Sequence, residues 1–504
     1  MIARHASPLR TAAITLFAAL LGACATPPRA VAPPPMLDAA GAGLGTSGAD
    51  HGTTKAAAGT TQATAGTTPA TPIPADWWRQ FGDPQLDRLV AQALQDNPGL
   101  AEAGARLRAA QAQLAGARSA TLPAAGLSAG ETRARIPSGF PQALAGGQSV
   151  WIGDLGASLD WDLDLWGREA DGIAQARSQA QAAGLDADTA RQWVAGAVVQ
   201  AYLDLYRSHA LADLAQRATE QRQDILDLTR RRTTAGLQTR VELLQAQGAV
   251  PAARQTLLQV QADQSLAIHQ LALLSGQGAQ AYAGITRPQL DPEAGLPVPD
   301  TLPLDLLARR PDVLAARARV AASDAHRRAA RAAFYPRISL RALAGYASFS
   351  LRDLVSAGSF GYGAGGSLAL PLFDGGRLRA QYQGADAELE ASIAAYNAVV
   401  LDAVHEAADQ LSRLEALRDE QAQQQQTLDA AEQAYRLASE RFRAGLSDQL
   451  TVLAAETQVL DARRQQLDLQ VALAQARIAL LLAVGGSFQP PRDASAPATA
   501  IAAH

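Results

Sequence analysis

The sequence predicts a mainly α-helical protein with a membrane β part, built from a tandem duplication of very long helices. Three observations predict this fold class. Glycine, proline and arginine landmarks of the first half recur in the second half of the 504-residue chain at a nearly constant separation. Each half contains a continuous helical pattern of about 68 residues. Each half also contains short segments in which apolar and polar residues alternate, as they do in strands with two different environments.

Composition supports long helices that pack through small side chains. Hydrophobic residues make up 48% of the chain, but aromatic residues only 5%, so alanine supplies much of the apolar surface. The net charge of -4 is spread along the chain. Because no basic face is visible, the composition argues against a nucleic-acid partner.

The N-terminus has the plan of an export signal. Residues 1–23 combine Arg4 and Arg10 with an apolar run that is too short to span a bilayer, which predicts a lipoprotein signal peptide. Cys24 is the only cysteine, so it cannot form an intrachain disulfide. Its position after Leu-Gly-Ala resembles the bacterial lipobox, which implies a lipidated Cys24, and Ala25 favours sorting to the outer membrane. The alternative is an ordinary exported precursor with an unmodified cysteine.

Residues 24–75 follow as a segment of distinct composition. They are rich in Ala, Gly, Thr and Pro and contain almost no large apolar side chains, so we expect a lipidated flexible tether. No later segment offers a run of about 18 apolar residues, so we expect no transmembrane helix in the mature protein.

The landmarks align the two halves in two registers. Asn97 and Pro98 match Arg310 and Pro311 at a separation of 213 residues, whereas Gly236 and Gly445 are separated by 209. An insertion of four residues reconciles the registers. The predicted organisation is therefore a first structural repeat at 76–276, an inter-repeat linker at 277–302, a second repeat at 303–485 and a disordered C-terminal tail at 486–504.

Periodicity changes in the same order in both repeats. The elements expected in the first repeat are a helix at 84–119, a strand pair at 122–165, a very long helix at 168–235 and a helix at 240–275. The second repeat is expected to contain the same elements at 303–334, 336–372, 376–443 and 447–484. A helix of about 68 residues extends ~100 Å, so the two shorter helices of a repeat are expected to stack end to end along it.

The last helix of each repeat carries an apolar seam of the coiled-coil kind. In the first repeat it consists of Leu243, Ala246, Val250, Ala253, Leu257, Val260, Gln264, Ala267, Leu271 and Leu274. In the second it consists of Val452, Ala455, Val459, Ala462, Gln466, Leu469, Leu473, Ala476, Leu480 and Ala483. A second seam of the last helix consists of Leu450, Leu453, Leu460, Leu467, Val471, Ala474, Ile478 and Leu481. Two seams predict neighbours on both sides of that helix.

The strand segments have the length and alternation of membrane strands. Along 155–165, leucine, alanine and tryptophan share one face, and Asp160, Asp162 and Asp164 lie on the other. Arg337 and Arg341 occupy the polar face of a strand in the second repeat. These five residues are the candidate lining of a barrel lumen.

Alternation alone leaves a soluble antiparallel sandwich open as an alternative. Four strands, however, are too few to close a barrel, and membrane sheets leave no edges open. A membrane sheet of this kind therefore requires several chains that share one barrel.

Several motifs carry a resemblance to a known family. The chain contains DWWRQFGDPQLDRLVAQALQDNPGL, WDLDLWGRE, LPLDLLARRPDVLAARARV, FYPRISL, LPLFDGGRLRA and two AGL turns, in this order over about residues 76 to 485. This combination resembles the outer-membrane factor (outer-membrane efflux protein) family of tripartite efflux systems, in its lipoprotein branch. The resemblance implies a homotrimer whose α-barrel crosses the periplasm and is continued by a shared 12-stranded β-barrel in the outer membrane, four strands per chain.

The resemblance also implies partners and a function. A periplasmic membrane-fusion adaptor and a proton-driven inner-membrane pump would deliver drugs or other small toxic compounds to this channel. By the same resemblance, Gly236, Leu237, Gly445 and Leu446 form the helix tips that contact the adaptor, and both glycines can take the positive φ that a helix end needs. The alternative is that these residues only end helices.

The periplasmic entrance departs from the family pattern. Several members carry an aspartate at the position of Ala454 and an arginine where this chain has Thr457. Glu242, Asp448 and Glu456 lie nearby in the sequence and are, with Ala454, the candidate lining of the entrance. The alternative is that these carboxylates are solvated charges on helix surfaces.

Rival functions have weaker support. Of the seven histidines, four lie singly on predicted helices, at His209, His269, His326 and His405. The body of the chain has no cysteine, and no nucleophile elbow or phosphate-binding loop is present, so we expect neither an enzyme nor a metal or other cofactor. A periplasmic adaptor would not contain two repeats with membrane-length strands. The outer-membrane duct of a type I protein secretion system could use the same architecture and is the alternative function.

Overall fold

The computed structural model describes residues 32–37, 73–139, 147, 149–294, 296 and 309–488. The predicted signal peptide, Cys24, most of the tether and nearly all of the C-terminal tail lie outside these residues. The structure divides into two compact units. The first contains the described parts of Met1–Met36, Arg106–Ala183 and Ala316–Tyr396. The second contains the described parts of Leu37–Ala105, Gly184–Ala315 and Asn397–His504.

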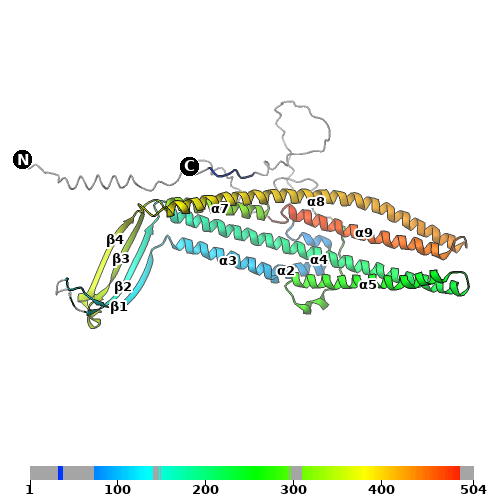
Figure 1. Ribbon diagram of the computed structural model, residues 1–504, viewed down its shortest axis with the longest axis horizontal. Coiled ribbons are helices and arrows are strands. Elements are labelled where there is room, and N and C mark those ends of the chain that lie inside the picture. The colour runs from blue at the N-terminus through cyan, green and yellow to red at the C-terminus, as the bar shows by residue number, and fades with distance from the viewer. Residues whose placement is uncertain are drawn as a thin grey trace, which may run out of the picture. The chain divides into compact units, whose positions relative to one another are not determined.

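The element order repeats along the chain (Figure 1). The first half contains η1 (Trp77–Phe81), α2 (Pro84–Asp96), α3 (Pro98–Ser119), β1 (Ala124–Arg135), β2 (Ser149–Leu163), α4 (Arg168–Thr234), α5 (Arg240–Leu274) and η3 (Ala279–Gly284). The second contains α7 (Pro311–Ala332), β3 (Arg337–Ser348), η4 (Leu351–Asp353), η5 (Ala357–Ser359), β4 (Phe360–Ala369), α8 (Arg377–Arg443) and α9 (Gln449–Ala483). The predicted order of elements is confirmed, and α4 and α8 each run for 67 residues.

The helix predicted at 84–119 is wrong as a single element, because it is broken at Asn97. Asn97 takes an extended conformation, with φ -64° and ψ 123°, as the residue before a proline prefers. Its side-chain oxygen then accepts from the backbone N of Gly99 at 2.8 Å, so Asn97 ends α2 and caps α3.

The first unit contains a four-stranded antiparallel sheet in the order β1-β2-β3-β4. In the register of β2 and β3, Asp160 lies opposite Arg341 and Leu159 opposite Ala342. Ile338 of β3 lies opposite Leu368 of β4. Apolar residues therefore meet on one face of the sheet, and charged residues on the other, as the alternation predicts.

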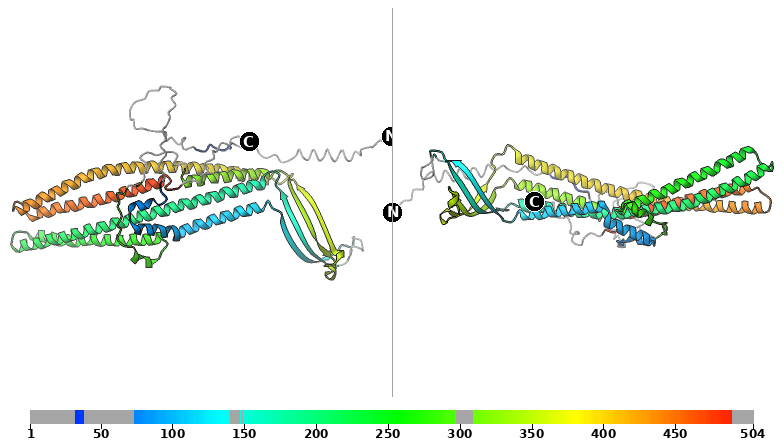
Figure 2. Two further views of the ribbon diagram at one scale, coloured as in Figure 1. Left: turned by 180° about the vertical axis from the view of Figure 1, so that it is seen from behind. Right: turned by 90° about the horizontal axis from the view of Figure 1, so that it is seen from below.

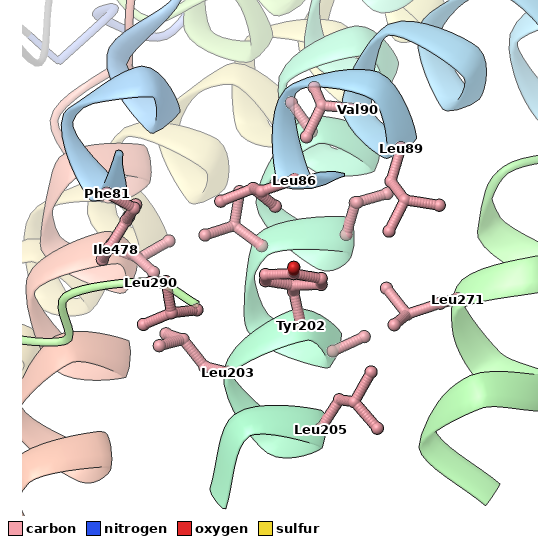
Figure 3. Close-up of a cluster of buried hydrophobic side chains, with 14 of the residues drawn as sticks. Phe81, Leu86, Leu89, Val90, Tyr202, Leu203, Leu205, Leu271, Leu290 and Ile478 are labelled. Carbon is pink, nitrogen blue, oxygen red and sulfur yellow. The ribbon is translucent and has the colours of Figure 1, made fainter. Parts of the chain in front are cut away.

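The second unit is built around a core shared by α2, α4, α5 and α9 (Figure 3). Leu86 and Val90 of α2, Tyr202 of α4, Leu271 of α5 and Ile478 of α9 are all completely buried. Because few aromatic residues are available, many leucine, valine and alanine contacts form this core.

Both predicted seams of α9 face neighbours. Leu467, Val471 and Ile478 pack in the cluster that includes Val194 and Val198 of α4. Leu473, Ala476 and Leu480 pack against Leu414 of α8. The prediction that this helix has neighbours on two sides is confirmed, and all members of the seam of α5 are likewise buried or half-buried.

A buried polar network ties the start of α2 to α4. The Tyr202 hydroxyl donates to Asp83 Oδ2 at 2.7 Å, and Gln85 Nε2 donates to the Tyr202 hydroxyl at 2.8 Å. The backbone N of Gln289 also donates to Asp83 Oδ2, at 2.7 Å. Burial alone raises the pKa of Asp83, but these donors outweigh it and hold the pKa below its ordinary value.

One stretch of α9 is long and apolar enough to cross a membrane by length and composition. It spans Leu450–Ala483, and half of its most apolar window is buried inside the protein. A core helix has the same properties, and the two occupied seams of α9 account for this apolar surface.

Candidate functional site

The polar face of the sheet carries two ion pairs between β2 and β3. Arg341 Nε donates to Asp160 Oδ1 at 2.6 Å, and Arg337 is paired with Asp162. All four side chains remain partly exposed on this face. The structure thus brings together four of the five residues predicted to line a lumen, and their alternating charges form a hydrophilic surface.

Asp164 does not belong to this face, which corrects the predicted strand. β2 ends at Leu163, and the Asp164 carboxylate accepts from the backbone N of Ala170 at 2.8 Å. Ala170 lies in the first turn of α4, where backbone N–H groups lack helical partners. Asp164 therefore satisfies a backbone N–H group in the first turn of α4.

The opposite face of the sheet is apolar and exposed in the single chain. Leu127 is 79% exposed, Leu159 45% and Leu368 63%. A monomeric soluble protein rarely exposes so many large apolar side chains on one face. This exposed face fits a hydrocarbon environment.

Aromatic side chains gather at both ends of the sheet. At the helix end, Trp166 stacks on Tyr335 with ring centroids 5.2 Å apart, and Trp161 Nε1 donates to the carbonyl of Thr121. At the other end, Tyr346 meets Phe360, and the Arg133 guanidinium lies over Trp151. Trp161 follows Trp151 by ten residue steps along β2, which is ~34 Å along a strand. At a tilt near 45°, this spacing gives ~24 Å, the height of an outer-membrane apolar band.

The sheet has two open edges. β1 and β4 each pair with one described neighbour, and no described strand pairs with their outer sides. Such edges present free backbone N–H and C=O groups, which cannot remain unpaired in lipid.

The two hairpin tips have the geometry predicted for them. Gly236 has φ +72° and Gly445 has φ +71°. The backbone N of Leu237 donates to the carbonyl of Arg232, and that of Leu446 to the carbonyl of Arg441, both at 2.8 Å. These bonds define a Schellman end for α4 and α8, in which a residue with a Cβ would be strained at the glycine.

Both tips present a leucine to solvent. Leu237 is 69% exposed and Leu446 is 70% exposed. The loops that carry them lie at the same end of the second unit (Figure 2). The structure thus brings together the four residues predicted as adaptor contacts on one end of this unit.

Glu242 and Asp448, predicted to line the entrance, have a structural role in the chain. The Glu242 carboxylate accepts from the backbone N of Thr239 at 2.6 Å, and the Thr239 hydroxyl accepts from the backbone N of Glu242, which completes a capping box. Asp448 Oδ1 accepts from the backbone N of Thr451 at 2.9 Å. The Thr451 hydroxyl also donates to Asp448 Oδ1, and this bond, together with the one from the Thr451 backbone N, lowers the pKa of Asp448. Both carboxylates stabilise the first turn of the helix that follows each tip.

Glu456 has a different environment. Burial raises its pKa, against a hydrogen bond with Gln221, and the nearby Asp224 carboxylate raises it further. Gln221 is itself buried, and its Nε2 donates to the carbonyl of Leu453. A carboxylate in this position favours its neutral form more than an exposed glutamate does.

Ala454 lines a groove between α8 and α9. The groove has a volume of about 950 Å³ and is lined by small and uncharged polar side chains, with Arg222 and Asp461 as its charged residues. Thr457 lies in the same groove, and its hydroxyl donates to the carbonyl of Leu453. Ala454 and Thr457, the two positions at which this chain departs from the family pattern, therefore both line this groove.

Within the described ranges, no group of three or more His, Cys, Asp or Glu side chains is arranged to hold a metal ion. The sequence analysis did not predict the helix-capping roles of Glu242 and Asp448, although the sequence contains a recognisable capping pattern at Glu242. Thr239 followed three residues later by Glu242 is the capping-box pattern.

Comparison with known proteins identifies what this arrangement resembles. A family model described as outer membrane efflux protein matches residues 89–277 and again residues 302–486. The chain is 38% identical over 318 residues to the fusaric acid resistance protein FusA of Burkholderia cepacia, a match that covers 62% of this chain and 60% of FusA. It is 31% identical over 428 residues to the pyoverdine export outer membrane protein OpmQ of Pseudomonas putida, covering 82% of this chain and 88% of OpmQ.

The fold has a counterpart among solved structures. The outer membrane protein VceC of Vibrio cholerae superposes with a TM-score of 0.76 at 31% identity, covering 83% of this chain and 100% of VceC. The similarity therefore includes the helices and the strands.

Proposed function

The chain belongs to the outer membrane efflux protein family, and on this premise we propose that three copies of it form the exit duct of a tripartite efflux system. The observation that carries the proposal is the open four-stranded sheet with one apolar face and one charged face. Three such sheets, joined edge to edge, make a closed barrel of twelve strands and satisfy every edge.

In this assembly, the charged face lines the lumen and the apolar face meets lipid. Asp160, Asp162, Arg337 and Arg341 then line a water-filled path with both signs of charge. A path of mixed charge does not select strongly for either sign of solute. Selection among substrates then falls to the pump that delivers them.

The relatives support small organic molecules as the exported class. FusA is named for fusaric acid resistance and OpmQ for pyoverdine export. By this similarity we assign the duct to drugs or other small toxic compounds rather than to the alternative, a protein secreted by a type I system.

The exposed tips support a partner in the periplasm. Leu237 and Leu446 give the end of the helices an apolar surface on a rigid Schellman turn. A helical hairpin of a membrane-fusion adaptor is the partner we assign to this surface, with a proton-driven inner-membrane pump behind it.

Two further assignments concern the ends of the path. Cys24, outside the described residues, is assigned as the lipidated N-terminus of the mature chain. At the periplasmic entrance, we assign Glu456 and Ala454 to the lining, and the caps formed by Glu242 and Asp448 hold the surrounding helix ends in place.

Deletion of the gene tests the function. The expected result is increased accumulation of, and susceptibility to, several small toxic compounds, restored by the wild-type gene. Unchanged accumulation of all tested compounds, together with loss of a secreted protein from the medium, would instead favour the type I alternative. Cys24→Ser is expected to abolish palmitate labelling, and retained labelling would reject the lipid assignment.

A further inference from the structure

α5 carries a row of large apolar side chains that the described part of the chain leaves uncovered. Its five exposed large apolar residues, each between 57% and 68% exposed, are Val241, Leu244, Leu258, Leu266 and Leu273. Steps of 3, 14, 8 and 7 residues separate them, so they lie on one stripe of the helix. None of them belongs to the seam through which α5 packs on α4. We call these five residues the free row of α5.

The internal repeat shows what such a row contacts when it is covered. A shift of 209 residues takes the free row to Leu450, Leu453, Leu467, Gln475 and Leu482 of α9. These positions face α4. Near the tip, Leu453 packs with Ile225. Further along, Gln475 Nε2 donates to Asp204 Oδ1 at 2.8 Å, and at the far end a Cβ on Gly196 would lie 2.4 Å from Leu482 Cδ1. The free row is therefore the counterpart of a surface that is covered in the second repeat.

The helices of the second unit form a series with two outer members. α9 packs with α8 on one side and with α4 on the other, and α4 packs with α5. The order is therefore α8, α9, α4 and α5, as Figure 1 shows. α5 and α8 lie at the two ends of this series, so neither covers the other within one chain.

α8 carries the other half of the same interface. On α4, Gln221 and Ile225 are buried, and Gln221 Nε2 donates to the carbonyl of Leu453 in α9. The shift of 209 residues leads from these two positions to Ala430 and Ala434 of α8. Both alanines are exposed and lie on the α8 wall of the groove described above. The chain thus presents two matching surfaces, one on each outer helix.

We propose that the free row of α5 packs on α8 of a neighbouring copy of this chain, in the register that α9 takes on α4. This inference deepens the proposed function and rests on the assembly of three copies. The shift of 209 residues pairs Leu244 of one copy with Ala434 of the next, as Leu453 and Ile225 pack within one chain. A leucine that meets small residues on the facing helix is a knob in a hole of a coiled coil.

The proposed interface differs in chemistry from the one within the chain. Between α4 and α9, Arg207 Nε donates to Asp468 Oδ1 at 2.7 Å. The same shift replaces these two residues by Ala416 and Gln259. The interface between copies therefore lacks this ion pair, and the burial of the free row holds it together.

Cysteine pairs test the contact in the full-length protein in isolated outer membranes. Leu244→Cys with Ala434→Cys places thiols at two exposed positions that the proposal brings together. Under mild oxidation, the protein is expected to shift from the mass of one chain to two and three times that mass on a non-reducing gel. Each single variant is expected to remain at the mass of one chain, which also controls for Cys24.

Two further pairs serve as matched controls. Leu453→Cys with Ile225→Cys occupies the equivalent positions within the chain, so its disulfide is expected to leave the mass at one chain. Leu244→Cys with Thr427→Cys moves one thiol seven residues along the same face of α8, which is ~10 Å. This pair is expected to give no covalent dimers or trimers.

Salt tests the apolar character of the interface. Added salt screens charges but does not weaken apolar contact. The covalent dimers and trimers of the Leu244→Cys and Ala434→Cys pair are therefore expected to form as well at high as at low ionic strength. Their loss at high ionic strength would show that charges hold the two surfaces together and would overturn the apolar interface.

The outcomes separate this interface from the proposed function. A wild-type protein that is a single chain in detergent would overturn the interface together with the proposed trimer. A wild-type trimer in which the Leu244→Cys and Ala434→Cys pair stays at the mass of one chain would overturn the interface alone. Equal cross-linking of Leu244→Cys to the positions of Ala434 and Thr427 would overturn the register.

Discussion

The Arg310 guanidinium donates from Nη1 to the carbonyl oxygen of Ala483 at 2.7 Å, at the last residue of α9. The first repeat contains the same relationship, because Asn97 Nδ2 donates to the carbonyl of Leu274, the last residue of α5, at 2.8 Å. In each repeat, the residue before a proline thus binds the C-terminal end of the final helix, where carbonyl groups lack helical partners. The duplication preserved the bond while the side chain changed.

Arg310→Ala is expected to destabilise the second unit. The Arg310 side chain is only 12% exposed and also pairs with Asp312 and Glu406, so its removal takes this donor from two carboxylates and a carbonyl. We expect the Arg310→Ala variant to have a free energy of unfolding about 2 to 3 kcal/mol below that of the wild type, which is the scale of hydrogen bonds to charged groups.

The neighbouring Arg309 is exposed and provides the matched control. Arg309→Ala is expected to change the thermal unfolding midpoint little when both variants are followed by circular dichroism. Equal midpoints for the Arg310 and Arg309 variants would contradict the role of Arg310.

Tyr202→Phe is expected to cost about 2 kcal/mol at neutral pH, because it removes a hydrogen bond to a charged carboxylate. The folded pKa of Asp83 is lowered, so the ionised Asp83 carboxylate stabilises the folded state fully at pH values above its ordinary pKa near 4. This stabilisation is lost as the pH falls through the lower, folded pKa. The difference between wild type and variant should therefore shrink in acid.

Unfolding of both proteins at pH 7 and below pH 4 measures this effect. With Asp83→Asn as a second background, a double-mutant cycle isolates the coupling between the two side chains. A stability difference that is independent of pH would show that the hydroxyl acts without the charge of Asp83.

Glu456→Gln tests the half-buried carboxylate assigned to the entrance. The folded pKa of Glu456 is raised, so the protonated carboxyl group stabilises the folded state. This stabilisation is fully present below the ordinary pKa of glutamate and is lost as the pH rises through the folded pKa. The Gln variant is therefore expected to gain stability relative to wild type between acid and neutral pH. A thermal unfolding series over this range, in which the difference stays constant, would contradict the raised pKa.

Leu446→Asp tests the tip surface. Leu446 is 70% exposed, so the substitution is expected to change the free energy of unfolding by no more than about 0.5 kcal/mol. It is nevertheless expected to raise susceptibility to exported compounds, because a charge replaces apolar contact surface on the tip. Leu446→Met, which preserves that surface, is the matched control, and full resistance in the Asp variant would argue against a partner at this site.

The sequence predicted the parts of the fold that depend on local patterns. The long helices, the seams and the positive φ of Gly236 and Gly445 follow from periodicity and from the steric needs of a helix end. The break at Asn97 was missed because the helical period continues through Pro98, although the residue before a proline avoids helical angles.

Contacts between distant residues were not predictable in the same way. Arg310 and Ala483 are 173 residues apart, and no local pattern indicates that they meet. Met36 lies in a segment with the composition of a flexible tether, and only its contact with Leu389 and Ile393 reveals that it docks. The partial burial of Glu456 likewise depends on the packing of α9 with α4.

The shared barrel is tested most directly by the mass of the detergent-extracted protein. Native mass spectrometry of the mature protein is expected to give three chains per particle, since each sheet leaves the outer sides of β1 and β4 open. A stable, folded single chain in detergent, with both edges of its sheet unpaired, would contradict the account.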